Sequence, residues 1–111
     1  MTDFNSSFKT WLEGSQKIVT DYAIEKSNGV KSTEDIYNKE LTVKKGRKYL
    51  KIIANDVFGD SGSVWAFIDT TNGDVLKPAS FKAPAKHARG NIYDFFNGLS
   101  SITPYGPVYL K

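Results

Sequence analysis

Cysteine is absent from this 111-residue chain, and histidine occurs once, as His87. The absence of cysteine excludes disulfides, cysteine-ligated zinc and thiol catalysis. A single histidine excludes a metal centre built from several imidazoles. The lack of cysteine also fits a reducing compartment, because disulfides do not persist there. We therefore expect a protein without a metal centre.

Long apolar runs are also missing. No stretch approaches the roughly 20 apolar residues that a helix needs to cross a bilayer. The N-terminal segment MTDFNSSFKTWLEG lacks the basic region and apolar core of a secretory signal. The sequence predicts a soluble, cytoplasmic protein that does not engage a membrane.

Motifs for catalysis and for nucleotide binding are likewise absent. The chain contains neither G-x-x-x-x-G-K-[ST] nor G-x-G-x-x-G, and it has no G-x-S-x-G. Four aspartates are candidates for holding a divalent ion in the manner of a nuclease: Asp56, Asp60, Asp69 and Asp74. Their predicted positions at strand ends and in turns fit turn chemistry better. We expect no enzymatic activity and no cofactor.

The length suits a single domain over residues 1–111, with a helix at its start. Apolar residues recur at helical spacing through residues 3–25, with Gly14 and Ser15 as possible weak points. This stripe could dock a partner, but packing against a sheet is the expected use. It comprises Phe4, Phe8, Trp11, Leu12, Ile18, Val19 and Tyr22. The predicted helix covers 1–26, and polar residues 27–39 are predicted as a loop.

Residues 40–79 predict two hairpins. Segments 41–43 and 49–53 flank a turn at Lys45-Gly46, while 64–69 and 74–77 flank Asn72-Gly73. Within the third segment we expect Trp65 and Phe67 to share one face. Residues 80–111 predict a basic linker, a short helix at 91–98 and an edge strand at 108–110. The predicted fold is α+β, a small antiparallel sheet of about four strands covered by the N-terminal helix, with a short C-terminal helix.

The net charge of +3 is unevenly distributed. Residues 1–40 carry a balance of −2, whereas residues 41–89 carry +5. Such asymmetry bears on partners and association rather than on fold. The middle of the chain is therefore the candidate for a functional basic face, although solvated surface lysines would give the same count.

The segment VLKPASFKAPAKHARGNIYD, residues 75–94, concentrates positive charge without an intervening acid before Asp94. Its candidate anion-binding residues are Lys77, Lys82, Lys86, His87, Arg89 and Asn91. Arginine suits bidentate phosphate contact, and the N-terminus of the helix predicted after Gly90 would favour an anion. Solvated lysines, an Arg89–Asp94 ion pair and a loop histidine remain alternative interpretations.

The first hairpin supplies a second basic segment, in which Arg47, Lys48 and Lys51 are candidate nucleic-acid contacts. Lys51 stands two residues from Tyr49, so both side chains share one face of a strand. Aromatic rings beside cations on an exposed sheet are typical of platforms for single-stranded nucleic acid. The match concerns the physics alone, because the RRM and KH motifs are absent.

Several strings resemble a family of small proteins encoded by tailed bacteriophages, which is itself uncharacterised. They are GRKYLKI, SVWAFID, NGD and above all KPASFKAPAKHARGN, and they span residues 46–92. The resemblance implies a phage origin and a role in the cytoplasm of an infected bacterial host. It implies no activity and no catalytic residues. The first 40 residues lie outside it, as a candidate lineage-specific part.

Three functions follow as hypotheses. The leading one is a non-enzymatic protein that binds DNA or RNA, or another polyanion, through the basic face. The second is an interaction module that modulates a host or phage factor, such as a polymerase or a defence system. The third is a minor structural protein of the virion. The sequence leaves the oligomeric state open.

Overall fold

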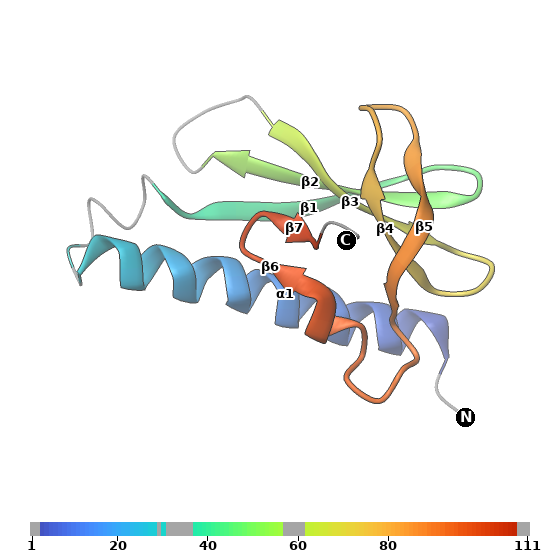
Figure 1. The fold of residues 1–111 in the computed structure, drawn as a ribbon, viewed down its shortest axis with the longest axis horizontal. Helices are drawn as coiled ribbons and strands as arrows, with labels where there is room; N and C mark the ends of the chain where they lie inside the picture. Colours follow the sequence, from blue (N-terminus) through green and yellow to red (C-terminus); the bar gives the residue numbers. More distant parts are fainter. Residues whose placement is uncertain (1–2, 29, 31–36, 57–61, 109–111) are drawn as a thin grey trace.

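The computed structural model describes residues 3–28, 30, 37–56 and 62–108. One long helix lies along one side of an antiparallel sheet (Figure 1). The predicted α+β class is confirmed, but the sheet has five strands rather than four. No helix in the described ranges is long and apolar enough to cross a membrane.

Helix α1 runs from Phe4 to Ser27 without interruption at Gly14. The side chain of Asp3 caps its start by accepting a hydrogen bond from the Ser6 N–H at 2.7 Å. Asn28 ends it in the left-handed conformation. The buried positions recur every fourth residue, at Ser7, Trp11, Ser15, Val19, Ala23 and Ser27. They form one ridge that packs against the sheet. Of the predicted stripe only Trp11 and Val19 lie on this ridge, while Phe4, Phe8, Leu12 and Ile18 pack partly buried against the core.

The main sheet has the order β1-β2-β3-β4-β5, so each strand pairs with its neighbours in sequence. Its strands are β1 (Lys39–Lys45), β2 (Tyr49–Asp56), β3 (Gly62–Asp69), β4 (Asp74–Pro78) and β5 (Pro84–Asn91). The turn predicted at Asn72-Gly73 is confirmed, and Gly73 has φ of 81°. Most of the predicted loop at 27–39 lies outside the described residues.

Strand β5 corrects the predicted basic linker. Alanine, proline and glycine give Pro84–Asn91 a low intrinsic β propensity. The segment nevertheless pairs antiparallel with β4, with Pro78 opposite Pro84 and Leu76 opposite Ala88. Pairing with an existing strand therefore overrides local preference. Pro78 and Pro84 form the last residue pair before the hairpin tip.

The predicted C-terminal helix at 91–98 is wrong. These residues form consecutive turns, and the only helical element there is a single 3₁₀ turn, η1 (Leu99–Ser101). Side chains compete with the helical backbone: the Asp94 carboxylate accepts from the N–H groups of Phe96 and Gly98. Asn97 and Gly98 then take positive φ values of 57° and 74°. A helix cannot continue through two left-handed residues.

A small second sheet ends the described chain. Strands β6 (Ile102–Thr103) and β7 (Gly106–Pro107) pair beside α1 and the main sheet (Figure 1). The strand predicted at 108–110 is not seen at Val108, and residues 109 and 110 lie outside the described ranges. Gly106 has φ of 109° and lies against the backbone of Trp65, where a Cβ would meet the carbonyl oxygen at 2.7 Å. Only glycine fits this position without displacement.

The hydrophobic core lies between α1 and one face of the sheet. Its largest fully buried side chain, Trp11, contacts Trp65 of β3 with ring centroids 6.1 Å apart. A β-bulge places Trp65 there, because Ile52 pairs with Ala66 while Ile53 pairs with Val64. Phe67 contacts Tyr49 instead, outside this core cluster. The prediction that Trp65 and Phe67 share a face is therefore wrong.

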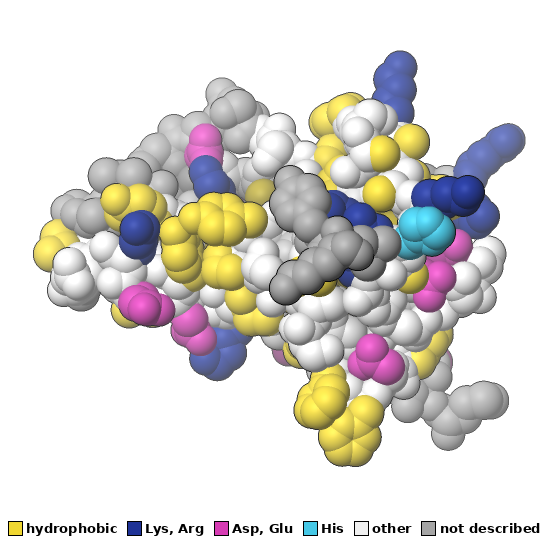
Figure 2. Space-filling model, viewed as in Figure 1, with side chains coloured by type: hydrophobic (Ala, Val, Ile, Leu, Met, Phe, Trp, Pro, Cys, Tyr) yellow, Lys and Arg dark blue, Asp and Glu magenta, His cyan; other side chains and the backbone are white. Residues whose placement is uncertain are grey.

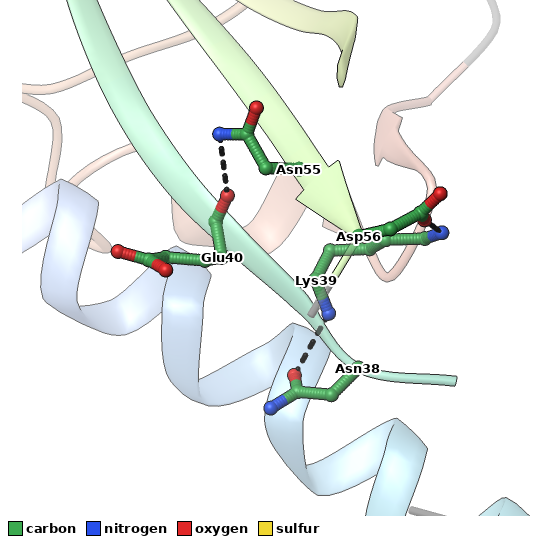
Figure 3. Close-up of polar contacts among 5 residues, drawn as sticks. All are labelled: Asn38, Lys39, Glu40, Asn55 and Asp56. Carbon is green, nitrogen blue, oxygen red and sulfur yellow. Dashed lines mark hydrogen bonds and ion pairs between the residues drawn. The ribbon is translucent and has the colours of Figure 1, made fainter. Parts of the chain in front are cut away.

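Figure 3 shows the end of the β1–β2 hairpin that lies opposite its turn, where polar contacts join the two strands. Lys39 forms an ion pair with Asp56, its partner in the register. The Asn55 amide donates to the Glu40 carbonyl at 3.3 Å. Asp56, one of the four aspartates considered for a divalent ion, is thus neutralised by a lysine.

Candidate nucleic-acid interface

The face of the sheet turned away from α1 is the outer face. Alternation along β2 places Leu50, Ile52 and Ala54 in the core, so Tyr49 and Lys51 point outward. The register brings Lys51 opposite Phe67 of β3 and opposite Lys44 of β1. The predicted pairing of Tyr49 with Lys51 on one face is confirmed.

These side chains border a cavity of about 380 Å³, which we call the basic groove. Its lining residues are Lys44, Lys45, Gly46, Arg47, Lys48, Tyr49, Lys51, Phe67 and Lys82. Six of the nine carry a positive charge, and two of the others are aromatic. The groove therefore combines a cationic rim with one partly exposed ring, Tyr49, because Phe67 is only 2% exposed. Cations beside an aromatic ring suit ligands that carry both phosphates and planar rings.

Lys51 lies between two aromatic rings at the edge of the basic groove. Its ammonium nitrogen is 4.1 Å from the ring centroid of Phe81 and 5.9 Å from that of Phe67. Ring faces attract cations without neutralising them. Lys51 is thus held in place while its charge remains available to an anion.

Phe81 and Lys82 come from the tip of the β4–β5 hairpin, far from Lys51 in sequence. The tip is closed by backbone bonds from Ala79 and Ser80 to the Ala83 carbonyl at 3.0 and 3.1 Å. The Ser80 hydroxyl also accepts from the N–H groups of Lys82 and Ala83. This bonding holds Phe81 outward, 57% exposed. The tip is therefore ordered before any ligand arrives.

No described ion pair relieves the repulsion among the cations of the basic groove, although the Asp69 carboxylate attracts Lys48. Lys44 and Lys51 stand directly opposite each other, an arrangement that destabilises a sheet. The described ion pairs involve Lys9, Lys17 and Lys39, and none of them reaches the six cations of the basic groove. Such a local conflict is expected at functional sites, where a ligand supplies the missing charge.

Asp69 lies opposite Tyr49 in the register, but its carboxylate is engaged in the β3–β4 turn. Burial raises the pKa of Asp69, and two hydrogen bonds from Thr71, at 2.6 and 2.9 Å, outweigh that effect. The nearby charge of Lys48 contributes in the same direction, so the pKa falls below its usual value. Among the described residues no group of three acids or histidines could hold a metal ion.

Two residues of the predicted basic segment contact the C-terminal tail instead of the basic groove. Lys77 donates to the Pro107 carbonyl at 3.0 Å, and Arg89 donates from Nε to the Val108 carbonyl at 3.0 Å. Burial lowers the pKa of Lys77, and the neighbouring charge of Arg89 lowers it further. Both cations therefore help to hold the tail against the sheet.

The remaining predicted residues of this segment are also separated from the basic groove. Asn91 donates to the Asn72 carbonyl at 2.8 Å and to Asp74 at 3.0 Å, so it ties β5 to the β3–β4 turn. Lys86 and His87 are exposed on β5 and do not line the groove. Of the nine predicted contact residues, the structure brings together Arg47, Lys48, Lys51 and Lys82.

The helix N-terminus expected to bind an anion after Gly90 does not exist, because residues 91–98 form turns. No helix dipole therefore favours an anion at that position. Asp94 bonds within its own turn and forms no described ion pair with Arg89.

Sequence reasoning missed the part that Phe67 and Phe81 play in the site. The signal for Phe67 was present in the alternation of β3, but the bulge at Trp65 concealed it. Phe81 could not be assigned because the β4–β5 pairing that presents it was predicted as a linker. Once β5 is a strand, a residue at its hairpin tip is expected to face solvent.

A family model matches residues 5–100, which include α1 from its second residue and the whole five-stranded sheet. Its description is a family of unknown function, DUF7717. The chain belongs to this family. The match begins in α1, so the N-terminal helix is part of the family unit together with the basic groove. No curated protein and no solved structure matches the chain.

Proposed function

We propose that this DUF7717 member binds nucleic acid, or another polyanion, through the basic groove without catalysing a reaction. The single observation that carries the proposal is the convergence of six cations on one cavity with aromatic walls. Phosphates release counterions when they meet such a surface, which favours binding. The resemblance to phage proteins adds the proposal that this occurs in an infected bacterium.

Replacing Arg47 and Lys48 together by alanine tests the proposal. Both side chains are exposed, so the fold should survive the change. Fluorescence anisotropy with a labelled 20-nucleotide strand and its duplex, at several salt concentrations, measures the affinity. Each phosphate contact contributes about −0.7, for a single strand, or about −0.9, for a duplex, to the slope of the logarithm of the binding constant against the logarithm of the salt concentration. The double variant should therefore bind more weakly and with a shallower slope.

A matched control removes the same charge elsewhere. Lys9 and Lys26 are exposed on α1, outside the basic groove, and the variant K9A/K26A has the same net charge as R47A/K48A. If both double variants lose affinity equally, binding depends on overall charge and the assignment to the basic groove fails. If neither parent nor variants bind any nucleic acid, the proposed function fails.

A second candidate function, a protein-interaction module, is favoured by a different feature. The turn after β5, which we call the aromatic turn, presents Tyr93, Phe95 and Phe96 at 46%, 93% and 62% exposure. Figure 2 shows hydrophobic side chains projecting from the lower edge of the molecule, where Figure 1 draws this turn. Rigid exposed aromatic residues are typical anchors at protein interfaces.

Affinity capture from nuclease-treated bacterial lysate discriminates the two functions. A stoichiometric protein that is retained by R47A/K48A but lost by F95A/F96A would favour the interaction module. Loss of all captured protein on nuclease treatment would favour binding to nucleic acid. The virion hypothesis is tested separately by mass spectrometry of purified particles.

A further inference from the structure

Two hollows share the outer face, and Phe81 stands between them. One is the basic groove, bordered by Lys82, the neighbour of Phe81. The other, which we call the neutral hollow, has a volume of about 340 Å³. Its described lining residues are Gly62, Ser63, Val64, Pro78, Ala79, Ser80 and Phe81, and none of these seven is charged.

The register confirms that both hollows open on the same face. Lys51 and Ile53 stand two residues apart on β2, and they pair with Phe67 and Val64. Phe67 lines the basic groove and Val64 lines the neutral hollow. A ligand that crosses this face therefore meets cations first, then the Phe81 ring, then a recess whose described residues carry no charge.

We propose that the outer face binds single-stranded nucleic acid, with the backbone in the basic groove and an unstacked base against Phe81 at the neutral hollow. This inference rests on the proposed function and specifies its ligand. A single strand offers negative phosphates and apolar ring faces side by side, in the combination that the two hollows present. Stacking on aromatic side chains is the usual way in which proteins hold unpaired bases.

Phe81 distinguishes a single strand from a duplex. Its ring is 57% exposed, and no described ring contact other than Lys51 involves it. In a duplex the ring faces of the bases are covered by their neighbours, so Phe81 would have nothing to stack on without unpairing. Each hollow is also near the lower end of ligand-pocket volumes, which suits single nucleotide units rather than stacked base pairs.

Lys51 connects stacking to charge. Its ammonium nitrogen lies 4.1 Å from the Phe81 centroid, so a phosphate next to a stacked base would meet a cation that is already positioned. Because the hairpin tip is closed by its own hydrogen bonds, the tip loses little conformational entropy when it binds the nucleic-acid strand. Ring and cation thus act on adjacent parts of one nucleotide.

The test compares Phe81→Ala with Phe95→Ala, which removes an equally large exposed ring from the aromatic turn. Both proteins and the parent are titrated into labelled dT₁₂, rU₁₂ and a 12-base-pair duplex, with circular dichroism to confirm the fold. We expect the parent to bind at least one single strand about tenfold or more tightly than the duplex. F81A should lose at least about fivefold toward that strand with an unchanged salt slope, while F95A should match the parent.

The outcomes separate the two levels of the proposal. Equal or tighter binding of the duplex, or equal affinities of F81A and F95A, would overturn the single-strand inference while nucleic-acid binding stands. Absence of binding to all three probes by the folded parent would overturn the proposed function itself. A preference between dT₁₂ and rU₁₂ would identify DNA or RNA as the better ligand.

Discussion

Arg47 and Arg89 have the same side chain and different surroundings. Arg47 lines the basic groove and is exposed, with no described hydrogen bond or ion pair. Arg89 donates to the carbonyls of Val108 and His87, so its guanidinium is committed to the fold. Sequence alone ranked both as candidate phosphate contacts. Their partners in space, rather than their residue type, distinguish the proposed ligand contact from the residue that holds the tail.

We predict that the two arginines separate stability from binding. Arg89→Ala should lower the free energy of unfolding by about 1 kcal/mol, because charge-assisted hydrogen bonds to the tail are lost. Arg47→Ala should change stability by less than about 0.5 kcal/mol, as for most surface substitutions. Urea denaturation measures both, and anisotropy with dT₁₂ measures binding. Equal effects of the two variants on stability would contradict the assignment.

Asp69 predicts a pH dependence. Its pKa in the folded protein lies below the ordinary value of 3.8, so the stability it contributes is present above about pH 4. That contribution is lost as pH falls through the lowered pKa. Asp69→Asn cannot titrate, so its deficit in stability relative to the parent should shrink in acid. Urea denaturation from pH 7 to pH 2.5 checks this, and parallel curves for the two proteins would refute it.

At the scale of elements, the edge of β1 is covered by a side chain. The Gln16 amide of α1 donates to the Lys39 carbonyl at 2.7 Å and accepts from the Leu41 N–H at 2.8 Å. These are the two bonds that a neighbouring strand would make. Exposed strand edges invite pairing with other chains, and natural sheets block them. Gln16 performs this role from the helix.

Removing the Gln16 amide should expose the edge. We predict that Gln16→Ala lowers the free energy of unfolding by about 1–3 kcal/mol, because two backbone groups lose their partner. Sedimentation velocity should reveal increased self-association. Gln16→Glu is the matched control, since a carboxylate can still accept from the Leu41 N–H but cannot donate to the Lys39 carbonyl. Its free energy of unfolding should lie between those of the parent and Gln16→Ala. A sedimentation coefficient for Gln16→Ala equal to that of the parent would show that the edge needs no such cover.

The helix and the first four strands could be predicted from sequence because periodicity and turn residues agree there. Trp11 and Val19 share a helical stripe, and Asn72-Gly73 marks a hairpin. Residues 84–91 could not, because nothing local in KHARGN favours a strand. That strand depends on the unpaired edge of β4, which is a property of the assembled sheet.

The candidate site was predictable only in part, for the same reason. Tyr49 and Lys51 are two residues apart, so their shared face follows from sequence. Lys82 joins them only through the β4–β5 hairpin, whose pairing no local pattern announces. The placement of Lys77 and Arg89 against the tail could not be predicted, because their partners, the carbonyls of residues 107 and 108, are backbone atoms that carry no sequence signal.

At the scale of the whole molecule, ligand binding should raise thermal stability. A ligand that binds only the folded state at 100 times its Kd adds about 2.7 kcal/mol. For a domain of this size, that corresponds to a rise in Tm of about 10 °C. Differential scanning fluorimetry with the tightest of the three probes measures it, and R47A/K48A at the same probe concentration should show little shift. A parent Tm independent of the probe would contradict binding to the native fold.

Alternate side chains of β2 point into the core and toward the basic groove, so the register of this strand limits which insertions and deletions the protein can tolerate. One extra or missing codon between residues 46 and 48 would invite the strand to slip by a single position against its partners. Lysine would then turn toward Trp11, while isoleucine and leucine would turn toward water. Insertions and deletions in residues 46–48 should consequently be tolerated far less than substitutions there. An insertion–deletion scan of the hairpin would show this as a loss of folded protein for length changes at residues 46–48, where substitutions are accepted.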